Sequence, residues 1–125
     1  MKQRKFSFRN QIRSFRFAFN GLKILLAEEH NSRIHFLIAA CVVVAGIAFE
    51  ISIFDWIALV FAIGLVITVE IFNSVIENIA DFVHPEKHDM IKKIKDLSAA
   101  GVLVSAVTAM LIGLIVFVPH ITRLL

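Results

Sequence analysis

Five polar residues recur along one segment, VEIFNSVIENIAD, whose other residues are mostly apolar. They are Glu70, Asn73, Ser74, Glu77 and Asp81. Their offsets of three, four, seven and eleven residues from the first member place them on one face of an α-helix. Such a face could bind a cation, accept a proton from a substrate, or hydrogen-bond to neighbouring helices.

Glu70 is the member of this face that a purely structural role explains least. If its helix enters a membrane near Trp56, a hydrocarbon layer about 30 Å thick ends near residue 76, about two turns beyond Glu70. An ionised acid deep in a bilayer costs on the order of 3 kcal/mol, and no basic residue lies within one turn of Glu70. As a structural alternative, Asn73, Ser74 and a protonated Glu70 could fasten neighbouring helices. Two glutamates two turns apart instead favour a site for a cation and an anion, since Mg²⁺ takes one or two carboxylates together with phosphate oxygens.

More charged residues gather at the same side of the apolar blocks described below. They are Glu28, Glu29, Arg33 and His35 before the first block, and Glu86, His88, Lys95 and Asp96 before the third. A zinc site is not expected, because no pair among His30, His35 and His88 has the i, i+4 spacing with a third partner. No GxxxxGK[ST] sequence occurs, so a nucleotide would have to be held without a P-loop.

The elements that position these residues follow from composition. The 125 residues are 58% apolar and 18% charged, with a mean hydropathy of +0.82. This excludes an ordinary soluble globule and a disordered chain. The single cysteine, Cys41, excludes a disulfide framework and a thiolate metal cluster. We therefore predict one all-α integral membrane domain over residues 1–125.

Three apolar blocks, 36–49, 56–69 and 97–118, predict three transmembrane helices. The third runs 22 residues without a charge, whereas the first two need polar neighbours to reach the roughly 20 residues that a bilayer requires. We predict spans at about 31–50, 56–83 and 97–118, with the third span ended by Pro119.

The basic residues predict the orientation of these spans. Of 13 Lys and Arg, eight precede the first apolar block, 36–49, four lie between the second and third spans, and none lies in the loop 50–55. The positive-inside rule places the N-terminus and the segment 84–96 in the cytoplasm and the C-terminus outside.

Residues 6–30 have the pattern of a basic amphipathic helix. Apolar residues recur every three or four positions, at Phe8, Ile12, Phe15, Phe19, Leu22 and Leu26, with basic residues beside most of them. Such a helix lies in the membrane interface, with arginines against lipid phosphates. It could serve only as an anchor or also touch a substrate; a nucleic-acid partner is not expected.

The segment VEIFNSVIENIAD, followed by HPEKHDMIKKIKDLSAA, resembles the prokaryotic diacylglycerol kinase family, small three-span lipid kinases that include undecaprenol kinases. The resemblance covers nearly the whole chain. Its most specific part is the pattern E-x-x-N-S-x-x-E with a downstream K-D, supported by GLK at 21–23 and EEHNSRIH at 28–35. The resemblance implies a homotrimer in the bacterial inner membrane, with sites shared between subunits. It also implies transfer of the γ-phosphoryl of ATP to the primary hydroxyl of diacylglycerol, giving phosphatidic acid, with undecaprenol as the alternative acceptor.

The resemblance further implies roles for individual residues. Glu70, with Asn73 beside it, would be the general base, and Glu29 and Glu77 would hold Mg²⁺ on ATP. Lys95 would contact the phosphates of the nucleotide and Asp96 its ribose. Further nucleotide contacts would come from Arg9, Arg13, Phe17, Glu86, Lys87 and His88. The lipid would meet Glu70 together with Ser14, Arg33 and Ala99.

Three departures from the family pattern affect this assignment. Phe17 stands where an aromatic residue with a hydroxyl can seat the nucleotide, and the chain has no tyrosine. Asn10 stands where an arginine can contact phosphate, which leaves Arg9 and Arg13 as alternatives. His35 stands where relatives that act on diacylglycerol can have an acid, and its RIH sequence is closer to the undecaprenol kinase branch.

Two functions of other classes compete with a kinase. Glu70, Glu77 and Asp81 could form a relay in a non-enzymatic ion or proton conduit. This is weakened because the stretch 56–69 is apolar apart from Thr68. A purely structural membrane subunit leaves the acids and lysines at the cytoplasmic side unexplained.

Overall fold

The computed structural model describes residues 5–125, and within that range it contains four helices and no strand. They are α1 (Phe8–Glu28), α2 (His30–Ala48), α3 (Ile53–Val83) and α4 (Asp89–Leu124). With 88% of the described residues in helices, the predicted all-α fold is confirmed. Two of the eight basic residues used for the orientation, Lys2 and Arg4, lie outside the described residues.

Three of these helices, α2, α3 and α4, are long and apolar enough to cross a membrane. At 1.5 Å per residue, the 19 residues of α2 measure about 28 Å, close to the thickness of a hydrocarbon layer. The 31 residues of α3 and the 36 of α4 measure about 46 and 54 Å. The last two helices therefore extend well beyond the layer that α2 spans.

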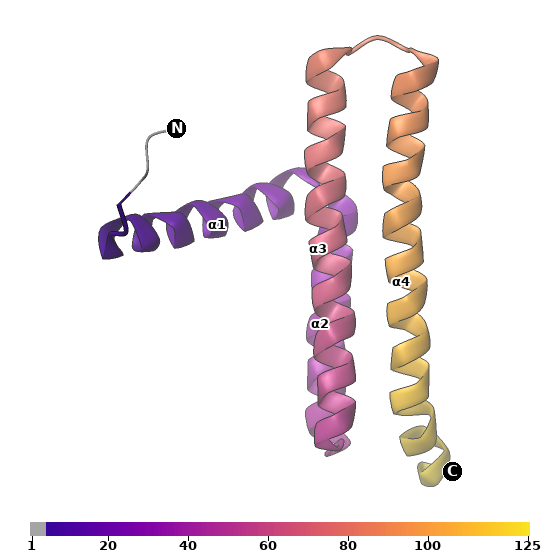
Figure 1. The fold of residues 1–125 in the computed structure, drawn as a ribbon. Coiled ribbons are helices and arrows are strands. Elements are labelled where there is room, and N and C mark those ends of the chain that lie inside the picture. The colour runs from indigo at the N-terminus through magenta and orange to yellow at the C-terminus, as the bar shows by residue number, and fades with distance from the viewer. Residues whose placement is uncertain (1–4) are drawn as a thin grey trace.

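Figure 1 shows how the helices are arranged. Helix α3 packs against both α2 and α4, while α1 runs away from the bundle at a steep angle to its axis. Helix α1 joins the bundle part of the way along α3, so the connected ends of α3 and α4 project past this junction. This is the arrangement expected of a surface helix followed by a transmembrane bundle.

The corner between α1 and α2 is held by one side chain. Glu29 separates the two helices with an extended backbone, φ −105° and ψ 109°. Arg33 donates from Nε to the carbonyl oxygen of Leu26 at 2.5 Å and from its Nη2 to that of Ala27 at 2.6 Å. These carbonyls lie in the last turn of α1, where no further helical N–H reaches them, so Arg33 caps α1.

The opposite end of the bundle is apolar and tightly packed. Ile51, Leu59 and Val116 are buried there, surrounded by Val42, Phe49, Trp56, Ile112 and Phe117. Gly46 is required for this packing, because a Cβ at that position would lie 2.7 Å from Cη2 of Trp56. The loop turns at Glu50, whose φ of 51° is in the left-handed region, and Ser52 caps α3 by accepting from the N–H of Asp55 at 3.2 Å.

The helix that contains the third predicted span, 97–118, extends beyond it at both ends. Helix α4 starts at Asp89, before the predicted 97, because His88 accepts from the N–H of Met90 and caps it there. The prediction that Pro119 ends this helix was wrong, since α4 continues to Leu124. A proline removes one N–H and crowds one carbonyl, and the last turn still closes, with Thr122 Oγ1 donating to the Pro119 carbonyl at 3.0 Å.

Candidate active site

A polar cavity of about 350 Å³ lies among α2, α3 and α4, near the junction with α1. The predicted helix face supplies Glu70, Asn73 and Glu77 to its wall, and α4 supplies Ala99. The link between α1 and α2 supplies Glu29. Five of the predicted site residues, distant in sequence, are therefore brought together.

Glu70 is buried at the wall of this cavity and held from α2. Only 5% of the residue is exposed, and each carboxylate oxygen has a partner: Ser32 Oγ donates to Oε2 and His35 Nδ1 hydrogen-bonds with Oε1. Ser32 and His35 are three residues apart, so one face of α2 presents both. Sequence analysis did not single out Ser32; its only signal was its place three residues before His35.

Asn73 and Ser74 make contacts between elements. Ser98 of α4 donates from Oγ to Oδ1 of Asn73 at 2.7 Å. Ser74 donates from Oγ to Oε1 of Glu29 at 3.3 Å. Both residues therefore make hydrogen bonds that fasten neighbouring elements, as the purely structural interpretation of this helix face expects. The bond from Ser74 also positions Glu29, one of the two predicted metal ligands.

The acids of the cavity fit magnesium better than zinc. Glu29 and Glu77 line the same cavity, and residues 5–125 contain no group of three His, Cys, Asp or Glu arranged to hold a metal ion by themselves. Zinc needs three or four protein ligands. Magnesium commonly takes one or two carboxylates and completes its shell with phosphate oxygens and water, so this pair suits a metal that arrives with a phosphate.

Lys95 and Asp96 lie on the projecting part of α4, before the predicted span 97–118, and do not line the cavity. Lys95 donates from Nζ to Oδ1 of Asp81 at 2.5 Å, and this hydrogen bond raises the pKa of the Lys95 amine above its ordinary value. Asp96 accepts from Nζ of Lys92 at 2.6 Å. The hydrogen bond to Asp96 likewise raises the pKa of the Lys92 amine above its ordinary value.

Three of the residues predicted to contact the nucleotide, Glu86, Lys87 and His88, lie in or beside the connection between α3 and α4, at the far tip of the projecting hairpin (Figure 1). Glu86 accepts at its carbonyl from the ring of His84 at 3.0 Å, and the rings of His84 and His88 meet edge to face, with centroids 5.2 Å apart. Within one chain, Glu86, Lys87 and His88 are therefore not cavity residues.

The residues predicted on the surface helix are also not at the cavity of their own chain. Arg13, Ser14 and Phe17 line a separate concave surface on α1, and Arg9 is exposed. Because α1 runs away from the bundle, none of them lines the cavity. Arg33 was predicted to meet the lipid; its guanidinium hydrogen-bonds with the carbonyls of Leu26 and Ala27, and its contact with a lipid stays a prediction.

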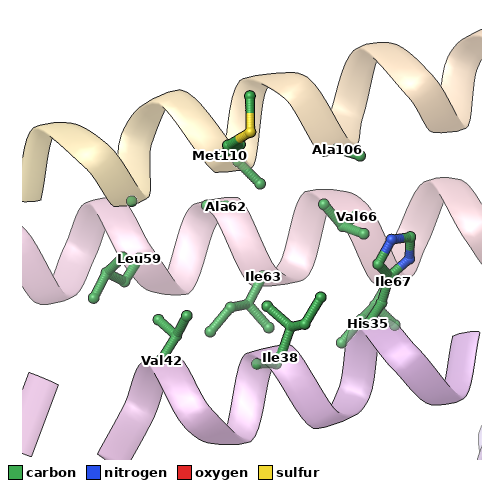
Figure 2. Close-up of a pocket in the computed structure, with 13 residues that line it drawn as sticks. His35, Ile38, Val42, Leu59, Ala62, Ile63, Val66, Ile67, Ala106 and Met110 are labelled. Atoms are coloured by element: carbon green, nitrogen blue, oxygen red, sulfur yellow. The ribbon is translucent and has the colours of Figure 1, made fainter. Parts of the chain in front are cut away.

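An apolar groove adjoins the polar cavity. It has a volume of about 330 Å³ and lies over α3, between α2 and α4 (Figure 2). Its walls are Ile38 and Val42 from α2, Ile63 and Val66 from α3, and Met110 from α4, among others. His35 and Ala106 line both the groove and the cavity, so the two spaces meet at these residues. Sequence analysis did not predict this groove, because it depends on how three helices pack.

Comparison with known proteins agrees with the resemblance. The family described as prokaryotic diacylglycerol kinase matches residues 16–117. The undecaprenol kinase of Bacillus subtilis (strain 168) is 32% identical over 109 residues, which are 87% of this chain and 89% of that protein. The diacylglycerol kinase of Synechocystis is 28% identical over 93% of this chain and 67% of its own length. That of Escherichia coli (strain K12) is 26% identical over 87% of this chain and 89% of its own length.

Proposed function

The chain belongs to the prokaryotic diacylglycerol kinase family, and we propose that it transfers the γ-phosphoryl of ATP, with Mg²⁺, to the primary hydroxyl of a membrane lipid. Family membership and the three apolar helices make it a prokaryotic lipid kinase and an integral membrane protein. What remains to be tested is the acceptor, the dependence on ATP and magnesium, and the part that each residue plays.

One observation carries this proposal: a buried carboxylate lies where a polar cavity meets an apolar groove. Glu70 lines the cavity, and its partner His35 lines both spaces. A lipid chain could occupy the groove while its hydroxyl enters the cavity, and a phosphate could reach the same cavity from water. Phosphoryl transfer needs mainly such positioning and neutralisation of charge.

In this proposal Glu70 is the general base. The lipid oxygen attacks the γ-phosphorus, the bond to the β-phosphate oxygen breaks, ADP leaves, and the hydroxyl proton passes to Glu70. Asn73 lies one turn along α3 beside the base. Glu29 and Glu77 would hold Mg²⁺, which supplies charge neutralisation on the phosphates when bound. Ala99 lies at the same wall, where its small side chain leaves room for the reacting groups.

We propose a homotrimer with shared sites: the number of subunits rests on the family resemblance, and the positions of the other nucleotide residues support the sharing of sites. Lys95 and Asp96 lie on the projecting hairpin that also carries 86–88, and in our proposal they contact the phosphates and the ribose. Arg9, Arg13, Ser14 and Phe17 lie on α1, which leads away from its own bundle. A helix directed outwards in this way could complete the cavity of a neighbouring subunit.

Two acceptors fit this chemistry. Diacylglycerol is the acceptor that the sequence predicts, and two of the relatives compared above are named diacylglycerol kinases. Undecaprenol is supported by the 32% identity to a protein named undecaprenol kinase and by His35 within the RIH sequence. Either acceptor presents a primary hydroxyl at the end of a long apolar chain, as the groove and cavity require.

ATP is cytoplasmic, so the proposed orientation puts the cavity near the inner face of a bacterial cytoplasmic membrane. The N-terminus and the segment 84–96 then lie in the cytoplasm and the C-terminus outside.

The test is label transfer by the purified protein in lipid vesicles. With γ-labelled ATP and Mg²⁺, we expect label in the lipid fraction when diacylglycerol or undecaprenol is present, and its loss when a chelator removes Mg²⁺. The relative rates with the two lipids identify the acceptor. Absence of transfer to both lipids, together with proton leakage through the same vesicles, would replace the kinase by a conduit.

A further inference from the structure

The contact between His35 and Glu70 is the feature that the proposed mechanism does not use. Both oxygens of the Glu70 carboxylate are occupied by side chains of α2, Ser32 on one and His35 on the other. Ser32 is only 2% exposed, whereas the His35 side chain is 24% exposed. The base is therefore held by two groups of one helix face, and the histidine is the one that also faces open space.

The charges around the cavity make this contact important. Three carboxylates line it, Glu29, Glu70 and Glu77, and the described residues of its wall include no Lys or Arg. The residues that α4 contributes, Ala99, Val102, Leu103 and Ala106, cannot be charged. His35 is thus the sole residue of the described wall that can carry a positive charge, and it lies against the most buried of the three acids.

A buried carboxylate without donors takes up a proton, because burial penalises the charged form. A hydrogen bond donated to the carboxylate favours the ionised form, and a charged donor favours it further. A base must be ionised and must face its substrate before it can take a proton. Ser32 can donate one neutral hydrogen bond, so His35 is the group of the described wall that can add a charged donor.

We infer that His35 is a positioning residue of the kinase: its Nδ1–H donates to Glu70 and directs that carboxylate to the point where groove and cavity meet. This assignment rests on the proposed function for its effect on catalysis. The state of the carboxylate does not depend on activity, and it can be measured separately.

Two substitutions at the same position separate a donor from a proton carrier. His35→Ala removes the donor. His35→Asn keeps an amide N–H close to the place of Nδ1 and cannot bind an extra proton at neutral pH. His30→Gln is the matched control, because His30 is an exposed histidine of the same helix and lines neither the groove nor the cavity.

We expect His35→Ala to lower kcat by roughly tenfold or more at neutral pH, with the KM for ATP little changed. Wild type and His30→Gln are the reference for both kinetic parameters. His35→Asn should recover most of the lost kcat. Wild-type kcat in His35→Ala, or equal losses in the Ala and Asn variants, would overturn the inference.

The second measurement needs no activity. The infrared carboxylate bands of Glu70, identified by their loss in Glu70→Gln, should shift in His35→Ala and return towards their wild-type positions in His35→Asn. If these bands do not move in His35→Ala, His35 does not hold the Glu70 carboxylate. An inactive wild type would overturn the proposed kinase, whereas the infrared result decides the His35–Glu70 contact by itself.

Discussion

The two ends of the bundle are built from the same three helices and differ in what they bury. At the end away from α1, the buried residues are apolar, namely Ile51, Leu59 and Val116. At the end near α1, polar residues are buried, and Ser32, Glu70 and Ser74 hydrogen-bond one another or their neighbours. One end is organised for packing and the other for chemistry.

This difference has an energetic meaning. Between transmembrane helices, apolar side chains stabilise through close packing, because lipid chains are as apolar as the side chains. Burial of a polar group is unfavourable unless its hydrogen bonds are made, and Ser32, Glu70 and Ser74 make theirs. We interpret the apolar end as the part that stabilises the helices and the polar end as the part that functions, and the predictions below test this division.

The largest expected effect is the difference between the two ends of the bundle in their accessibility to a thiol reagent outside the cell. In a Cys41→Ser background, Ser52→Cys marks the apolar end and Lys87→Cys marks the tip of the projecting hairpin. A thiol reagent that cannot cross membranes should label position 52 in intact cells and should not label position 87, because 84–96 is predicted to be cytoplasmic. Lysed cells provide the control, in which both positions should react. Labelling of position 87 alone in intact cells would place the polar end outside, away from ATP.

The next effect concerns metal at the polar end. Glu77→Gln removes one carboxylate of the proposed pair, so the Mg²⁺ concentration needed for half-maximal activity should rise by roughly tenfold or more. The KM for ATP should rise with it, since metal and nucleotide bind together. Titration of Mg²⁺ in the label-transfer assay measures both. An unchanged requirement would mean that Glu77 is not a ligand.

A substitution at the apolar end should change stability more than chemistry. Gly46→Leu places a side chain where a Cβ alone would lie 2.7 Å from Trp56, and should lower the free energy of unfolding by about 1 to 3 kcal/mol. Gly64→Leu is the matched control, since nothing lies within 4 Å of a Cβ there. Unfolding by denaturing detergent measures the difference. If both variants unfold alike, the contact between Gly46 and Trp56 does not stabilise this end.

A smaller effect is expected on the small-residue face of α4, formed by Ser98, Gly101, Ser105, Ala109 and Gly113. Part of it packs on α3 of the same chain, because a Cβ at Gly101 would lie 3.7 Å from Cγ1 of Val69. Gly101→Leu or Ala109→Leu should loosen packing and lower activity without touching a proposed catalytic group. Gel filtration and label transfer check this, and unchanged oligomer size and activity in both variants would argue against a packed face.

The smallest expected effect is a change in the pKa of the Lys95 amine. Its hydrogen bond with Asp81 raises its pKa, so the stabilisation by this pair is complete below the ordinary value of 10.5 and is lost as the pH rises through the higher value in the folded protein. Asp81→Asn should bring the titration midpoint of the Lys95 amine down towards 10.5, as followed by NMR of the side-chain nitrogen. A midpoint that does not move would show that the pair does not persist in solution.

The sequence predicted those features that depend on local pattern. Helix content, the three spans and the grouping of Glu70, Asn73 and Glu77 on one face follow from periodicity and from the cost of acids in a membrane. The prediction that Pro119 ends its helix was wrong, because a proline near the end of a helix removes few hydrogen bonds and need not terminate it.

The partners of Glu70 could not be predicted from local pattern. Ser32 and His35 lie 38 and 35 residues from Glu70 in sequence, and only the packing of α2 against α3 brings them together. The apolar groove arises in the same way, from three helices at once. The separation of the α1 residues from the cavity depends on the corner at Glu29, which the sequence marks only as a place where charged residues gather.

The turnover of Glu70→Gln, in vesicles with labelled ATP and an accepted lipid, tests most directly the claim that the polar end of the bundle is the functional one. Gln keeps the shape of the side chain and removes the base, so turnover should fall by about 10² or more while the affinity for ATP with Mg²⁺ stays near that of wild type. Glu50→Gln, which changes an acid at the apolar end, should leave turnover unchanged. Wild-type turnover in Glu70→Gln would contradict the account, because the polar end would then bury a carboxylate that does no chemistry.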